Sequence, residues 1–133
     1  MTLKFGMLRH ESILCLADQI QFTEQCEAAI RENSLQQFLS EVEGQLDAYT
    51  QANVQIGGQT GVLELKLKAL ILDTIHGIEV VQLLMKNNIT STEEWLWQKQ
   101  LRYYVRGDGI AIMRMVDAEF EYTYEYQGKP PHS

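Results

Sequence analysis

The chain has 133 residues, 45% of them hydrophobic and 22% charged, which is typical of one globular domain with a single core or of a piece cut from a larger protein. Eighteen acidic against eleven basic residues give a formal net charge of −7, and lysine and arginine form no cluster. Nucleic acids and anionic membranes attract basic surfaces, so this composition argues against both as partners.

The two cysteines and the lengths of the apolar runs predict where in the cell the protein is located. Cys15 and Cys26 belong to no C-x-x-C pair and have no neighbouring histidine, so we expect reduced packing thiols in a cytosolic protein. No apolar run reaches the roughly 20 residues of a membrane span. The N-terminal residues also lack the apolar core and the small-residue cleavage site of a secretory signal.

Two helices are predicted in the first half of the chain. In the first, from Glu11 to about Arg31, the apolar face changes sides, so the helix either touches different neighbours at its two ends or breaks near Gln19. The second begins with an S-x-x-Q capping box at Ser34. It carries one apolar stripe, made of Leu35, Phe38, Leu39, Val42, Leu46 and Tyr49.

A predicted loop then leads into a long third helix. The stretch from Gln51 to Gly61 is rich in glutamine, asparagine and glycine, which indicates a loop and a possible hinge. From about Val62 to Lys86 the pattern is helical and apolar on two faces, which is typical of a core helix between neighbours. Asn87-Asn88 should end it, because asparagine tolerates the left-handed conformation.

The most aromatic stretch runs from Trp95 to Tyr104, W-L-W-Q-K-Q-L-R-Y-Y. Ser91 with Glu94 forms a second capping-box pattern, and the apolar spacing after it predicts a helix that ends at the turn 107–109. Residues 110–116 and 120–126 then alternate with period 2, which predicts a β-hairpin turning around Asp117-Ala118. The expected fold is mainly α, an antiparallel bundle of about four helices with a C-terminal β-hairpin, divided into residues 1–107 and 108–133.

No motif predicts catalysis or metal binding. The glycine-rich stretch 57–61 lacks the lysine of a P-loop, so it predicts a connector. His10, His76 and His132 are too scattered for a metal site, and His76 is expected in the core or at an interface. Spacing gives neither cysteine a base, which argues against nucleophilic catalysis.

The acidic and aromatic residues near the C-terminus also have structural explanations. Glu94 is expected to cap its helix, and the glutamates between the strand aromatics are expected on a solvated edge. Because those interleaved groups are carboxylates and not cations, the aromatics suit core packing or protein docking better than nucleic-acid stacking. The predicted structural or docking residues are Trp95, Trp97, Leu101, Arg102, Tyr103, Tyr104, Tyr122, Tyr124 and Tyr126.

Two motifs in this region resemble dynein heavy chains. W-x-x-Q-L-R-Y-Y, from Trp97 to Tyr104, is similar to the family pattern W-x-x-Q-L-R-[FY]-Y, and Y-T-Y-E-Y-Q-G, from Tyr122 to Gly128, is similar to Y-x-Y-E-Y-x-G. Upstream, Q-I-Q-F-T at 19–23 resembles Q-I-x-W-T, and Thr74-Ile75-His76 matches a segment where the family often has a hydrophobic residue before histidine. The resemblance extends from about residue 13 to residue 128 and is most like the second cytoplasmic dynein, the dynein of retrograde intraflagellar transport.

The resemblance implies a mechanical role. It corresponds to the C-terminal end of the linker, the arm that joins the first AAA+ module and swings as nucleotide is processed. The family continues after this point into an L-V-x-T-P-L-T-D stretch and a Walker A loop, whereas residues 129–133 are K-P-P-H-S. No nucleotide-binding residue therefore carries over, and an excised piece or a truncated product is expected.

The resemblance also implies partners and a location. The segment would be non-catalytic and bind no cofactor, while ATP and magnesium would act in a parent ATPase motor of the cytoplasm, cytoskeleton and cilium. Its direct partner would be the AAA+ ring of the same heavy chain, and other dynein subunits and microtubules would be reached only through the parent. The alternative is a free-standing helical adaptor that binds a protein through its aromatic surface, and a small enzyme is the third reading.

Overall fold

The computed structural model describes residues 9–56 and 61–122 and confirms a mainly α fold with a small antiparallel sheet at its C-terminal end. The elements, in chain order, are α2 (Arg9–Glu32), α3 (Leu35–Ile56), α4 (Gly61–Lys86), α5 (Trp95–Gln98), β1 (Arg102–Val105), β2 (Ala111–Met115) and β3 (Ala118–Glu121). Within these described ranges, no helix combines the length and apolar character needed to cross a bilayer.

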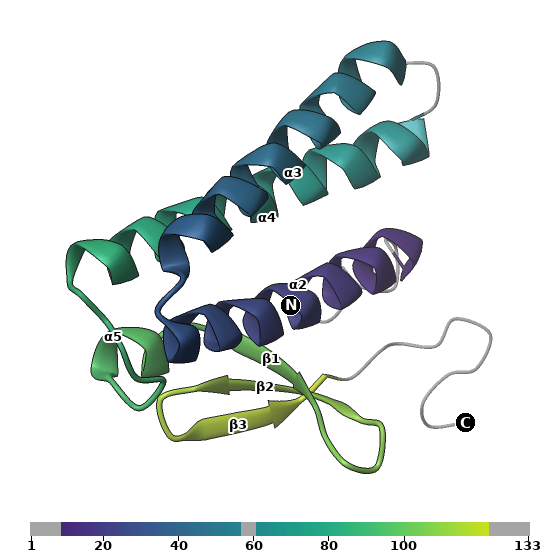
Figure 1. Ribbon diagram of the computed structural model, residues 1–133. Coiled ribbons are helices and arrows are strands. Elements are labelled where there is room, and N and C mark those ends of the chain that lie inside the picture. The colour runs from purple at the N-terminus through teal and green to yellow at the C-terminus, as the bar shows by residue number, and fades with distance from the viewer. Residues whose placement is uncertain (1–8, 57–60, 123–133) are drawn as a thin grey trace, which may run out of the picture.

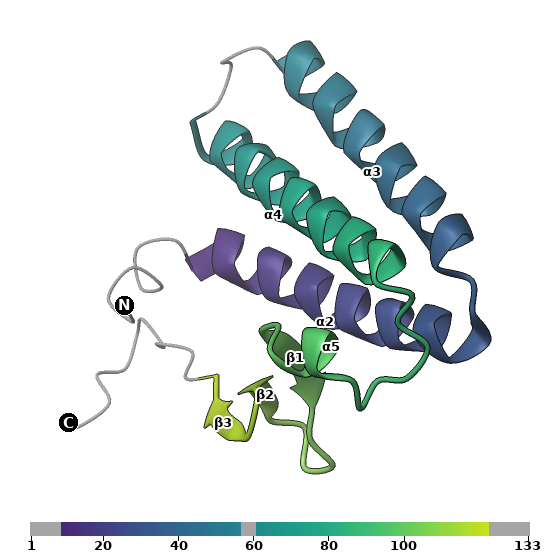
Figure 2. The same ribbon diagram turned by 90° about the vertical axis from the view of Figure 1, so that its left-hand side faces the viewer.

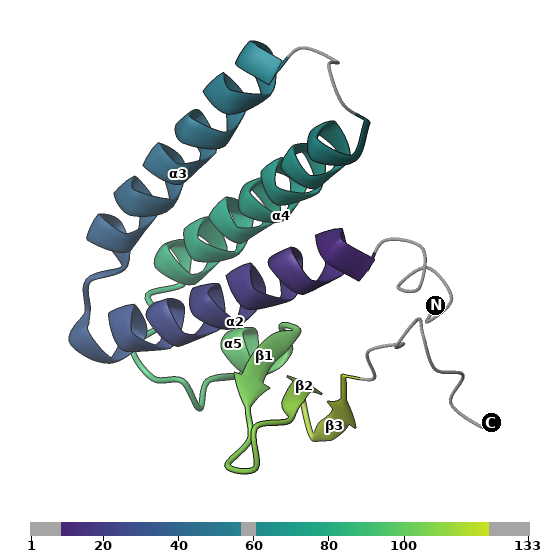
Figure 3. The ribbon, with the colours of Figure 1, turned by 90° about the vertical axis from the view of Figure 1, so that its right-hand side faces the viewer.

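The three long helices and the sheet are stacked in order (Figure 1). α3 and α4 form an antiparallel helical hairpin, and α4 lies between α3 and α2 (Figures 2 and 3). The sheet lies against the other side of α2, with β1 next to the helix. α2 is therefore shared by the helical layers and the sheet.

α2 is one continuous helix, so the alternative of a break near Gln19 is wrong. Its apolar face changes sides because the helix contacts α3 and α4 as well as β1. Cys26 and Ile30 are fully buried in the core shared with α3 and α4. Cys26 is thus a packing thiol, as predicted, and burial raises its pKa to about 12; the side chain of Cys15 lies outside the described residues.

α3 begins directly after Ser34, as predicted, and the first half of its apolar stripe is buried. The helix continues through Ile56, so the loop predicted from Gln51 is helical over its first six residues. Local composition failed there because this stretch extends a helix that already exists, and extending a helix costs less free energy than starting one. The rest of the predicted hinge, residues 57–60, lies outside the described residues.

Both helix ends marked by asparagine have the left-handed geometry. Asn88 has a φ of 55°, and the amides of Asn88 and Ile89 bond back to the carbonyls of Met85 and Leu84 at 3.1 Å each. Asn33 ends α2 in the same way, with a φ of 57°. These Schellman motifs satisfy carbonyls that would otherwise be left unpaired, and they confirm the predicted end of α4.

Only one of the two apolar faces predicted for α4 is buried. That face, which includes Leu67, Leu70, Val81 and Leu84, packs against α2 and α3. On the other face Leu72 is 67% exposed, and the side chain of His76 is 71% exposed beside Glu79. His76 is therefore not a core histidine, because the buried residues of α4 form one stripe and His76 lies outside it.

The predicted aromatic helix is mostly not helical. α5 has four residues, and from Arg102 the chain is a β-strand paired with β2. The capping box is also absent at α5: the Glu94 carboxylate accepts from the amide of Thr90 at 3.0 Å, while the Ser91 hydroxyl accepts from Glu93 at 3.1 Å. Tyrosine and valine favour strands, and pairing of this segment with β2 outweighed the helical spacing of its apolar residues.

The sheet has the order β1-β2-β3 with antiparallel pairing throughout. The predicted hairpin exists as β2 and β3, turning at Val116-Asp117, and β1 extends it to three strands. The glycine-rich turn at 107–109 thus joins β1 to β2, with Gly109 at a φ of 87°. The proposed division between residues 107 and 108 falls inside this turn and remains a prediction.

Two glycines offer matched tests of helix packing. A Cβ at Gly77 of α4 would lie 2.9 Å from the Phe22 ring of α2, whereas a Cβ at Gly44 of α3 would meet nothing within 4 Å. Alanine at Gly44 should stabilise the protein by about 0.5–1 kcal/mol through helix propensity. The Gly77→Ala variant should be less stable than the Gly44→Ala variant by about 1–3 kcal/mol, because the Phe22 ring must move. Urea unfolding measures both, and equal stabilities would contradict the close approach of α2 and α4.

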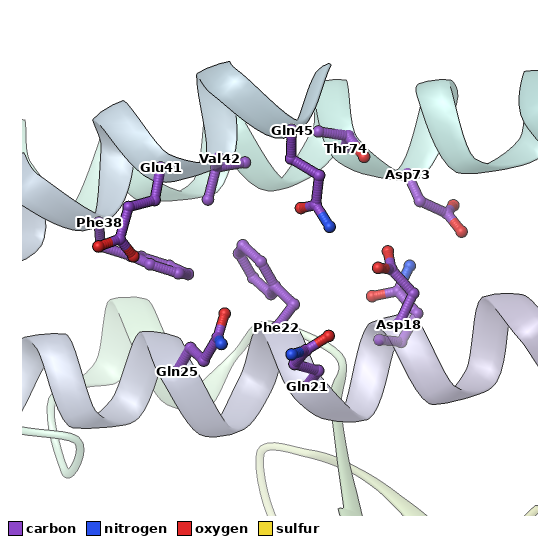
Figure 4. A pocket seen from close by; sticks show the side chains of 11 residues that line it. Asp18, Gln21, Phe22, Gln25, Phe38, Glu41, Val42, Gln45, Asp73 and Thr74 are labelled. Carbon is purple, nitrogen blue, oxygen red and sulfur yellow. The ribbon is translucent and has the colours of Figure 1, made fainter. Parts of the chain in front are cut away.

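Asp18 of α2 and Asp73 of α4 line the same side of the space between the helices (Figure 4). Burial, and then the charge of Asp73, raise the pKa of Asp18, while a hydrogen bond from the Tyr49 hydroxyl at 3.4 Å acts in the opposite direction. A raised pKa in the folded protein means that ionisation of Asp18 favours unfolding. The destabilisation is absent below the ordinary pKa and complete above the raised one.

Asp18→Asn should therefore stabilise the protein near pH 7 by on the order of 0.5 kcal/mol, because Asp18 is only half-buried and solvent screens its charge. The gain should shrink as the pH falls toward about 3, where the wild-type carboxyl is also neutral. Melting temperatures across this range test the expectation, with Asp47→Asn on the exposed side of α3 as the control. A gain of the same size at every pH would contradict the electrostatic cause.

Candidate functional site: the helix–sheet junction

One carboxylate joins three elements where the sheet meets α2. Oε2 of Glu27 on α2 accepts a hydrogen bond from Nε1 of Trp97 on α5 at 2.8 Å, and another from the Tyr104 hydroxyl on β1 at 2.6 Å. The donors are 70 and 77 residues away in sequence. Hydrogen bonds to a charged group are stronger than neutral ones, so Glu27 fixes both aromatics to α2.

Thr23, one turn before Glu27 on the same face of α2, makes a second contact between this helix and the sheet. Its hydroxyl oxygen, which is buried, accepts from the backbone amide of Tyr103 at 3.0 Å. An edge strand needs partners for its outward amides, and here a helix side chain supplies one. β1 is thereby bound to β2 on one edge and to α2 on the other.

Arg102 is the buried cation of the junction, with 3% of its surface exposed. Its guanidinium donates to the carbonyls of Gln98 and Gln100 at 3.0 and 3.1 Å, to the Tyr104 hydroxyl at 3.1 Å and to the Val116 carbonyl at 3.5 Å. Five donors in a planar fork suit such a set of acceptors. The charge is linked to Glu27 through the Tyr104 hydroxyl.

The turn between β2 and β3 is strained where it meets Arg102. Val116 has a φ of 58°, a conformation that is unfavourable for a β-branched residue. Its amide donates to the Gln98 carbonyl at 2.7 Å, and its carbonyl accepts from Arg102. These contacts from the end of α5 and the start of β1 hold the turn in a conformation that it would not adopt alone.

Tyr104 lies between charges of both signs. Burial, followed by the hydrogen bond to Glu27, raises its pKa to about 12, although Arg102 acts in the opposite direction. Arg102 and Arg114 also contact its ring, with guanidinium carbons 5.9 and 5.6 Å from the ring centre. At neutral pH the Tyr104 hydroxyl is therefore protonated and can donate a hydrogen bond to Glu27.

The junction borders a polar cleft of about 460 Å³, lined by Arg102 and Arg114 together with Glu27, Glu93 and Glu119. Arg114 pairs with Glu119 at 2.8 Å. Charges of both signs thus compensate one another inside the cleft. Among the residues that the structure describes, no group of three His, Cys, Asp or Glu side chains is arranged to hold a metal ion.

The predicted docking residues divide into three groups. Trp97 and Arg102 are buried in the junction, while Tyr103, Tyr104 and Tyr122 are half-buried. Trp95 and Leu101 are exposed, by 61% and 46%. Tyr124 and Tyr126 lie outside the described residues.

Sequence reasoning missed Glu27 and the role of Thr23. The available signal was that Thr23 and Glu27 are four residues apart on α2, next to the apolar residues Phe22 and Cys26. Polar side chains on a partly buried helix face need partners. Nothing in the sequence indicated which distant residues those partners were.

Comparison with known proteins agrees with the two motifs. No family model matches the chain. It is 67% identical over 123 residues to cytoplasmic dynein 2 heavy chain 1 of Tripneustes gratilla, and 49% identical over 120 residues to that of Homo sapiens, with 87% of the chain covered in each case. The chain is a homologue of a segment of the dynein heavy chain.

The protein of the same name from Rattus norvegicus is 46% identical to this dynein homologue over 123 residues, which cover 90% of the chain. The chain spans about 3% of the length of these curated relatives. The aligned length includes most of the helices and the sheet, so the homology applies to the described fold as a unit.

Proposed function

We propose that the chain is the non-catalytic C-terminal part of a dynein linker, next to the first AAA+ module, in a motor for retrograde intraflagellar transport. The observation that carries this proposal is the homology to cytoplasmic dynein 2 heavy chains over 87% of the chain. The motif from Trp97 to Tyr104, which resembles the end of the linker, supports the position within the heavy chain.

The contacts at the helix–sheet junction suit a part that transmits force. Trp97 and Tyr104 are both bonded to Glu27, and Thr23 binds the β1 backbone, so the sheet cannot shift along α2 without breaking hydrogen bonds. α4, packed between α2 and α3, stiffens the helical layer above. In this proposal the sheet faces the AAA+ ring of the same heavy chain, and microtubules are reached through the rest of the motor.

The test uses a full-length dynein 2 heavy chain that carries Glu27→Gln. The amide keeps the shape of the side chain but removes the charge that binds Trp97 and Tyr104 most strongly. Microtubule gliding should slow severalfold while ATP turnover continues, because force transmission is loosened and the nucleotide sites are intact. Glu43→Gln, on the exposed side of α3, is the control.

Two results would overturn the proposal. The first is gliding at the wild-type rate in a Glu27→Gln motor whose junction amides exchange hydrogen faster, since the junction would then carry no force. The second is micromolar binding of ATP by this 133-residue chain in a calorimetric titration, which would place a nucleotide site within the segment.

A further inference from the structure

A groove separates α2 from α3 on the side of the helical layers shown in Figure 4. It has a volume of about 330 Å³, and Asp73 and Thr74 of α4 contribute to its wall. The rings of Phe22 and Phe38 lie 5.5 Å apart, and with Val42 they form an apolar floor. Phe38 and Val42 are buried, while Phe22 is half-buried and reaches toward α3.

The rim of this groove is acidic and amidic. Asp18 and Asp73 lie on one side of the Phe22 ring, and Glu41 lies on the other (Figure 4). No lysine or arginine is among the described residues that line it, and the other polar side chains of this described lining are glutamines and one threonine. The groove therefore combines an apolar centre with negative charge at both ends.

We propose that this groove binds a basic amphipathic segment of a partner polypeptide, with an apolar side chain over Phe22 and lysine or arginine beside the carboxylates. On a helix, residues four apart lie on one face, so a basic, apolar and basic series with that spacing presents the complementary pattern. Burial and the neighbouring Asp73 charge already disfavour ionised Asp18, and a bound cation would relieve that repulsion.

Other occupants fit the groove less well. An acidic groove repels phosphate groups, which argues against nucleic acid. Two copies of a chain with a net charge of −7 repel each other, which argues against self-association. The proposal does not rest on the linker assignment, because only the groove residues enter it.

The experiment measures fluorescence anisotropy of a labelled helical peptide of about 14 residues, a length of about 21 Å, built from lysine, leucine and alanine. The chain should bind it with micromolar affinity, and the double variant Asp18→Asn, Asp73→Asn should bind about fivefold to tenfold more weakly. The matched control, Glu43→Gln with Asp47→Asn, changes net charge equally on the exposed side of α3 and should bind like the wild type.

Backbone amide spectra identify where the peptide binds, and circular dichroism checks that each variant folds. The proposal is supported when shifts concentrate at Gln25, Glu41 and Gln45. It is overturned if both double variants weaken binding equally, because the attraction is then to net charge alone. Equal binding of a peptide with glutamate in place of lysine, or a dimer of the chain that the groove variant dissociates, would also overturn it.

Discussion

Trp97→Ala should lower the free energy of unfolding by about 3–5 kcal/mol, because the ring is 1% exposed and belongs to the core formed with α2, α3 and α4. The substitution leaves a cavity and also removes one of the two donors to Glu27. Urea unfolding followed by circular dichroism measures the loss. A loss below about 1 kcal/mol would show that the ring does not belong to this core.

The chain supplies a matched control for this variant. Trp95 is on the same short helix but is 61% exposed, so Trp95→Ala should change stability by less than about 0.5 kcal/mol. Trp97→Phe separates the two causes, since phenylalanine fills much of the space but cannot donate to Glu27. It should lie between wild type and Trp97→Ala, and a loss as large as that of alanine would assign the effect to the hydrogen bond.

Arg102→Ala should destabilise the protein by about 3–5 kcal/mol, because it removes a buried guanidinium and takes its donors away from the part-buried Gln100 carbonyl and the Tyr104 hydroxyl. The amide of Val116 should exchange hydrogen faster, since the strained turn loses one of its two restraints. Arg102→Lys should recover only part of the loss, because a single ammonium cannot reproduce the fork. Urea unfolding and hydrogen exchange measure the two effects.

Arg114→Ala is the control for Arg102→Ala. Arg114 lies opposite Arg102 in the register of β1 and β2, but it is exposed and pairs with Glu119 on the surface. Surface ion pairs contribute at most about 1 kcal/mol, so this variant should cost little. Equal losses for the two variants would contradict the role assigned to the buried guanidinium.

Local patterns in the sequence were sufficient for the long helices, the end of α4 and the β2–β3 hairpin. The reason is that a helix or hairpin of this length depends mostly on the periodicity of its apolar residues, and that the end of α4 depends on a local residue, Asn88. The dynein motifs likewise predicted the family that the comparisons then identified. Each of those features depends on residues that lie close together in the sequence.

Contacts between distant residues decided the rest. Residues 102–105 have both helical spacing and strand-forming side chains, and they became β1 because β2 and α2 offered partners for their backbone. The bonds from Tyr103 to Thr23 and from Tyr104 to Glu27 span 80 and 77 residues. Spacing along the chain carries no information about such partners, so the junction that buries Trp97 and Arg102 required the tertiary structure.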